Sequence, residues 1–182
     1  MTTWMLLEYS DDLLVKLFSH IDLPDFVRLF DLTELATYSA FSPLLVKDDA
    51  DGKLSRLMRQ APADWPGLMI DSEHTSHALL NHLRHILIVR LNQNVKGMLR
   101  YWNPDIARHF FPACTEANLI DWLGPVSRLQ WHSTSTPERQ ILDNPCASTW
   151  LEAATSLLAL SAEQQQSINL KIQSPASSGQ ES

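Results

Sequence analysis

The sequence predicts an α/β (mixed α+β) fold, with a central sheet of about five or six strands flanked by helices and a C-terminal helical appendage. Two observations support this fold class. Short apolar runs of strand length alternate with segments whose apolar residues recur at helical spacing, and such alternation favours a layered domain of sheet and helices. The chain has 182 residues, 45% hydrophobic and 19% charged, which suffices for one domain with a substantial core.

The first half of the chain contains four predicted strands and three predicted helices. The strands are short apolar runs at residues 3–10, 26–31, 43–49 and 66–72. Helical spacing of apolar residues predicts helices at residues 11–21, 33–40 and 51–61. Pro66 and Gly67 interrupt the chain and mark the start of the fourth strand.

The second half continues the alternation. A long helix is predicted at 73–91 and a fifth strand at 95–102. Asn103 then caps a short helix whose first residue is Pro104. The remaining predicted elements are a helix at 116–123, a sixth strand at 126–133, a polar loop at 134–144 and a final helix from residue 145 to about 172.

The final helix is expected to be an appendage, because it follows the longest polar loop. Its apolar side would carry Trp150, Leu151, Leu157, Leu158 and Ile168. We therefore divide the chain into a domain at residues 1–133, a loop and helix at 134–172, and a polar tail at 173–182 that is expected to be disordered.

Composition excludes several classes of protein. The net charge is −7 and the cations are scattered, whereas sequence-independent binding to nucleic acid requires clustered Lys and Arg. Cys114 and Cys146 form no CxxC pair. They suit free thiols in a reducing compartment, and a single disulfide between them is the alternative. The first residues lack the cationic region of a signal peptide, and no apolar run reaches the roughly 20 residues of a membrane span. A soluble, cytoplasmic protein without membrane contact is expected.

Four of the seven histidines lie in residues 74–85. On a helix, His74, His77, His82 and His85 would share one side, opposite the main apolar stripe. The rise across them is about 16 Å, so one metal ion cannot bind all four, and a catalytic zinc ion usually needs three protein ligands. The favoured interpretation is a solvated or interface-facing side rich in imidazole. The alternative is a small metal-dependent hydrolase that uses this helix face.

Other catalytic and cofactor signatures are absent from the sequence. The chain has five glycines and neither a GxGxxG nor a GxxxxGK[ST] motif. It also lacks a GxSxG nucleophile elbow. We therefore predict no enzyme activity, no metal and no cofactor.

Several stretches, taken in order and spacing, resemble the adaptor chaperones of bacterial type VI secretion. The motifs are a helical His-Leu-Arg, an Arg-Tyr-aromatic sequence before Pro, and a Gly-Pro turn before a strand with Trp. The matching residues are His82, Leu83, Arg84, Arg100, Tyr101, Trp102, Pro104, Gly124, Pro125 and Trp131. Residues 4–10 and 28–49 are similar to the segments that open the family's domain, and the resemblance covers about residues 3–132.

The chain departs from this pattern at three positions. Asn103 stands where the family has Asp, Asp105 stands where it has Arg, and Glu8 stands where Asp is usual. Asn103 can still cap the following helix. If the altered positions contact a partner, the alternative is a changed choice of partner. Arg84 and Arg100 are expected at the edge of the core, either in a structural network with acceptors or in direct contact with a partner.

The resemblance implies a cytoplasmic adaptor chaperone that is not an enzyme. Its partners would be a toxic effector protein and the VgrG spike protein onto which the effector is loaded. The final helix, with Trp150 and Leu157, would either form one contact surface or pack on its own domain.

Overall fold

The computed structural model describes residues 1–91, 95–132, 138–152 and 156–173. Its centre is a six-stranded sheet in the order β2-β3-β1-β4-β7-β8, in which every neighbouring pair is antiparallel. The strands are β1 (Thr2–Leu7), β2 (Phe26–Arg28), β3 (Leu44–Lys47), β4 (Gly67–Ser72), β7 (Val126–His132) and β8 (Arg139–Asp143). This confirms the predicted mixed α+β class and the size of the sheet.

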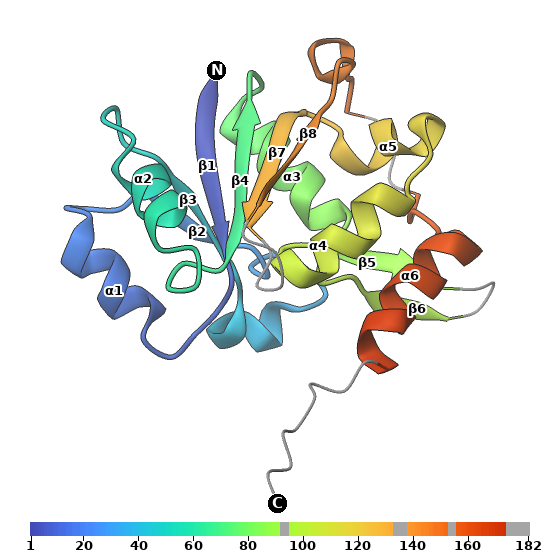
Figure 1. Cartoon of the computed structure of the whole chain (residues 1–182), viewed down its shortest axis with the longest axis horizontal. Coiled ribbons are helices and arrows are strands. Elements are labelled where there is room, and N and C mark those ends of the chain that lie inside the picture. Colours follow the sequence, from blue (N-terminus) through green and yellow to red (C-terminus); the bar gives the residue numbers. More distant parts are fainter. Residues whose placement is uncertain (92–94, 133–137, 153–155, 174–182) are drawn as a thin grey trace, which may run out of the picture.

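Helices cover both faces of the sheet (Figure 1). One side carries α1 (Leu13–His20) and α2 (Lys53–Gln60). The other side carries α3 (Ser76–His85), α4 (Pro104–Phe110), α5 (Glu116–Leu123) and α6 (Ala162–Gln173). A second sheet pairs β5 (Ile88–Arg90) with β6 (Lys96–Met98). Short 3-10 helices are η1 (Ala36–Phe41), η2 (Phe111–Ala113) and η3 (Ala147–Thr149).

The central strands are apolar on both sides because both faces of the sheet are covered. In β1, Trp4 and Leu6 belong to the hydrophobic cluster beneath α3, α4 and α5. Met5 and Leu7 belong to the cluster beneath α1 and α2. Successive side chains of a strand point to opposite faces, so a continuous apolar run is the expected pattern for a strand buried on both faces.

Three of the predicted elements were wrong. The long helix at 73–91 is the shorter α3, and the chain then turns into β5. The fifth strand at 95–102 contributes only β6, which pairs with β5 outside the main sheet. The polar loop at 134–144 contains β8, the edge strand of the main sheet. Alternating Gln140 and Leu142 are half-buried there, which explains why this polar segment still forms a strand.

The final helix was predicted too early in the chain. Residues 147–149 form η3, and Arg90 then pairs with Ala159 in a parallel bridge. Helix α6 begins only at Ala162 and packs against α4. Leu160 and Ile168 join the main hydrophobic cluster. The predicted boundary at residue 133 falls between β7 and β8, which pair in one sheet. Of the tail predicted to be disordered at 173–182, Gln173 is the last residue of α6, and residues 174–182 lie outside the described residues.

Candidate functional site

An apolar groove lies beside the segment that links β6 to α4. This segment passes from the end of β6 into a turn that the Asn103 N–H closes by donating to the Arg100 carbonyl at 3.0 Å. Leu99 and Tyr101 are buried in the core, whereas Met98, Arg100 and Trp102 line the groove. The family-like sequence around Arg100 therefore forms one wall of an open site.

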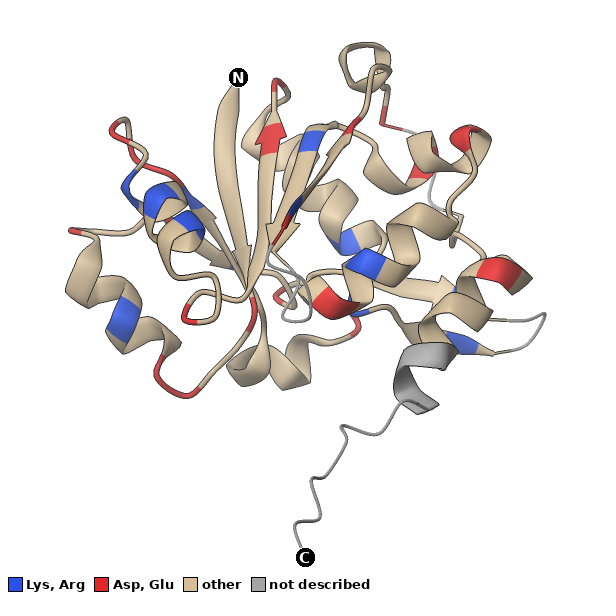
Figure 2. Cartoon of the chain, viewed as in Figure 1, with Lys and Arg blue, Asp and Glu red and all other residues tan. Residues whose placement is uncertain are grey.

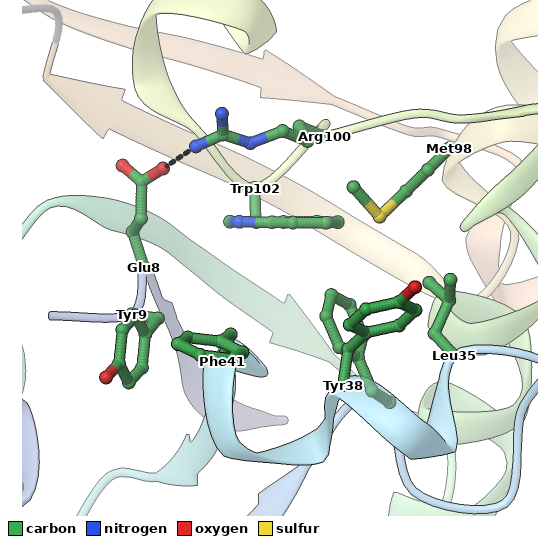
Figure 3. Close-up of a pocket in the computed structure, with 9 residues that line it drawn as sticks. Glu8, Tyr9, Leu35, Tyr38, Phe41, Met98, Arg100 and Trp102 are labelled. Atoms are coloured by element: carbon green, nitrogen blue, oxygen red, sulfur yellow. Dashed lines mark hydrogen bonds and ion pairs between the residues drawn. The ribbon is translucent and has the colours of Figure 1, made fainter.

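The opposite wall is η1 and the residue that precedes it. Leu35, Tyr38 and Phe41 are three residues apart and all line the groove. η1 is kinked at Tyr38, and the three side chains nevertheless face the same groove. Figure 3 shows these three side chains along the lower side of the groove, with the Trp102 indole and Met98 above them.

The groove has a volume of about 460 Å³ and is lined mainly by apolar and aromatic groups. Phe30 and Trp102 are buried at its base, where their rings meet edge to face with centroids 5.7 Å apart. Tyr38 is 59% exposed and Phe41 60% exposed. Water-exposed aromatic groups over a buried aromatic base are the chemistry of a site that binds apolar side chains.

Glu8 closes one end of the groove through a polar network (Figure 3). Arg100 donates a hydrogen bond of 2.5 Å to Glu8 Oε1. The side-chain amide of Asn103 donates to both oxygens of the same carboxylate, at 3.0 and 2.9 Å. The side-chain oxygen of Asn103, Oδ1, accepts hydrogen bonds from the backbone N–H groups of Asp105 and Ile106. Asn103 thus caps α4, as predicted.

Arg84 donates to two backbone carbonyls of its own chain. Its Nε donates to the Leu29 carbonyl at 3.2 Å, and a terminal nitrogen donates to the Arg28 carbonyl at 3.3 Å. The side chain therefore ties α3 to the segment after β2. Arg84 thus has acceptors at the edge of the core, while Arg100 is 54% exposed and lines the groove.

The histidine-rich side of α3 is not uniformly solvated. His77 is exposed, His85 is half-buried, and His82 is only 5% exposed. His82 donates from Nε2 to the Trp122 carbonyl at 2.9 Å, and its burial lowers the pKa of its imidazole to about 4. The predicted solvated or interface-facing position was therefore wrong for His82, because the turn after α5 covers that part of the helix.

Gly124 makes this packing possible. It adopts φ +51°, and a Cβ at this position would collide with the ring of His82. The next residue, Pro125, accepts a hydrogen bond of 2.7 Å from Ser72. The Gly-Pro motif is thus a tight turn that brings β7 to β4 and covers His82.

A second hollow, of about 660 Å³, runs along this side of α3. Its lining includes His77, His85, Arg84 and Trp150. Trp150 packs edge to face against the rings of His74 and His82, with ring centroids 5.5 and 5.6 Å apart. Within the described ranges, no group of three His, Cys, Asp or Glu side chains is placed to hold a metal ion.

The other predicted site residues lie in the framework. Leu83, Tyr101, Pro104 and Trp131 are buried, and the Tyr101 hydroxyl donates to the Leu83 carbonyl at 2.8 Å. Leu157 is half-buried and precedes α6 instead of lying in a helix with Trp150. Cys114 is partly buried, which raises the pKa of its thiol to about 11. Such a thiol carries very little thiolate at neutral pH.

Sequence reasoning missed half of the groove. Leu35 and Tyr38 fall in the helix predicted at 33–40, Phe41 follows it and Met98 falls in a predicted strand, and no functional role was predicted for any of them. The signals were the three-residue spacing in η1 and the two-residue spacing of Met98, Arg100 and Trp102. Neither spacing is informative until the two segments are known to face each other.

The chain belongs to the family described as a domain of unknown function (DUF4123), whose model matches residues 3–120. All the residues that line the apolar groove fall inside the matched region. No curated protein and no solved structure matches the chain. In the described part of the chain, no helix is long and apolar enough to cross a membrane.

Proposed function

We propose that this chain is a cytoplasmic adaptor chaperone that binds a type VI secretion effector and helps to load it onto the VgrG spike protein. The observation that carries the proposal is the apolar groove between η1 and residues 98–102. Its wall contains the Arg100–Trp102 motif through which the sequence resembles the secretion adaptors. Binding rather than chemistry is its proposed role.

The proposed mechanism is reversible burial of apolar surface. An apolar segment of the effector would remove Tyr38, Phe41 and Met98 from water, and full burial of one such side chain contributes about 1.5–3 kcal/mol. Aromatic residues and Arg commonly dominate binding energy at interfaces. Arg100 would orient the segment at the end of the groove. No nucleotide or cofactor is required by this mechanism.

Co-purification tests the proposal. The chain would be expressed with the effector and spike proteins encoded beside its gene, and recovered through a tag on the effector. We expect a stable complex with the wild-type chain and at least about tenfold weaker binding after the double change Tyr38→Ser and Phe41→Ser.

Leu151→Ser is the matched control, because Leu151 is 83% exposed but lies outside the groove. This change should leave the complex intact. Recovery of the chain with neither effector nor spike protein would reject the proposed function, and equal losses for both variants would reject the groove as the site.

A further inference from the structure

Strand β8 leaves one row of backbone groups open at the edge of the main sheet. Asn144 N–H donates to the Ser127 carbonyl at 2.9 Å. Hydrogen-bonded and non-hydrogen-bonded residue pairs alternate along an antiparallel ladder, so this bond and the β7–β8 register together determine which residues of β8 bond to β7. Residues 140 and 142 therefore bond to β7, whereas Arg139, Ile141 and Asp143 direct their N–H and C=O groups outward. Within the described residues, no hydrogen bond occupies the outward groups of Ile141.

The same three residues also lie on an open part of the sheet face. Arg139 and Asp143 are exposed, and Ile141 is 47% exposed. An edge strand with unpaired backbone groups and an exposed apolar side chain is a template for pairing with another strand.

Charge alternates across the strands toward this edge. Asp71 of β4 is paired in register with Arg128 of β7, which is paired with Asp143 of β8. Arg128 Nε donates to Asp143 at 2.5 Å. Figure 2 shows the resulting series of red, blue and red on β4, β7 and β8. The next strand in this row should therefore carry a cation opposite Asp143.

At the other end of β8, an added strand needs a residue of the opposite charge. Arg139 is paired in register with His132, whose pKa is lowered first by burial and then by the charges of Arg139 and Arg59. An added strand should therefore carry an anion opposite Arg139. Opposite Ile141 it should carry an apolar residue.

A second copy of β8 meets all three requirements. We propose that two copies of this chain pair antiparallel through β8, about a two-fold axis at Ile141. Arg139 of each copy then faces Asp143 of the other, and the two Ile141 side chains face each other. This is the self-complementary arrangement that a two-fold interface requires. It joins the two six-stranded sheets into one continuous sheet.

The pairing is independent of the proposed function, because β8 lies beyond the groove and beyond the family-matched residues 3–120. Each copy keeps its own groove. The dimer would therefore present two identical partner sites.

Sedimentation equilibrium of the full chain over a range of concentrations tests the pairing. We expect a reversible monomer–dimer equilibrium for the wild type. Arg139→Glu places an anion opposite Asp143 of the other copy, and Asp143→Lys places a cation opposite Arg139 of the other copy. The two-fold axis repeats each contact, so either variant alone should weaken the dimer at least about tenfold. Mixing the two variants restores both attractive pairs, so a heterodimer should form.

Ile141→Pro supplies the backbone control. Proline removes an outward N–H group and leaves the hydrogen bonds between β7 and β8 intact, so the monomer should keep its fold, as checked by circular dichroism, and lose the dimer. A monomeric wild type at every concentration would overturn the proposal. So would single variants that dimerise like the wild type, or a mixture that stays monomeric.

Discussion

At the scale of single residues, Glu8 organises the end of the groove. It accepts hydrogen bonds from Arg100 and Asn103, and its side chain is only 18% exposed. An amide at position 103 can donate to this carboxylate, whereas a second carboxylate cannot. In this chain the Asn103 side chain therefore has two roles, because its oxygen caps α4 and its amide group binds Glu8.

Asn103→Asp should destabilise the fold at neutral pH. Asp still caps the helix, but it places a second carboxylate against Glu8 and removes two donors. We expect a loss of about 1–2 kcal/mol in the free energy of unfolding, measured by urea denaturation at pH 7.5. The double variant with Glu8→Gln removes the repulsion and should recover part of the loss. Additive losses would contradict this account of the pair.

The burial of His82 predicts a pH dependence of stability. Its pKa in the folded state is about 4, below the ordinary histidine pKa of 6.5, so the unfolded chain binds more protons between these values. Stability should therefore fall as pH decreases from 6.5 toward 4. At pH 5 the loss relative to pH 7.5 should be about 2 kcal/mol from this residue.

Urea denaturation of the wild type and of His82→Asn at both pH values measures this contribution. The variant is less stable but lacks the imidazole, so its difference between the two pH values should be smaller by about that amount. Equal pH differences in the two proteins would show that His82 does not titrate as its burial requires.

At the scale of elements, periodicity predicted the strands and helices whose burial is simple. β1, β3 and β4 are mainly apolar runs, β7 alternates apolar and polar residues, and α1, α2 and α5 carry a regular apolar side. The predictions failed where contacts between segments distant in sequence determine the secondary structure. β8 forms because β7 offers an unpaired edge, and α3 ends early because Leu87 pairs through its backbone with Leu99. Neither contact can be read from local sequence.

The start of α6 did carry a sequence signal. Ser161 and Gln164 form a capping box, in which each side chain bonds to the other residue's backbone N–H, at 3.2 and 2.8 Å. The buried Gln164 amide also reaches the Cys114 sulfur at 3.2 Å. The apolar residues at 150–158 directed the prediction to an earlier helix, although the Ser-x-x-Gln pattern marked the true beginning.

Ser161→Ala should therefore destabilise α6 and its packing on α4. The lost cap predicts a decrease of about 1 kcal/mol in the free energy of unfolding. Faster hydrogen exchange of the amides in α6 would locate the effect. Ser156→Ala, at an exposed position outside the helix, is the control and should have little effect. Equal exchange rates in the Ser161 variant and the wild type would contradict the capping role.

At the scale of the whole molecule, the sheet and its two helical layers position segments that are distant in sequence. The groove is formed where η1, from the first quarter of the chain, faces residues 98–102. Its base belongs to the main hydrophobic cluster through Phe30 and Trp102. A rigid base beneath exposed aromatic groups limits the conformational entropy lost when a partner binds.

Hydrogen exchange of the chain alone and in complex with its effector tests the central claim most directly. We expect binding to protect the amides of residues 35–41 and 96–102, the two walls of the groove, while residues 147–152 beside the histidine-rich side of α3 exchange unchanged. Protection confined to α3 and residues 147–152, with none in the two walls, would contradict it.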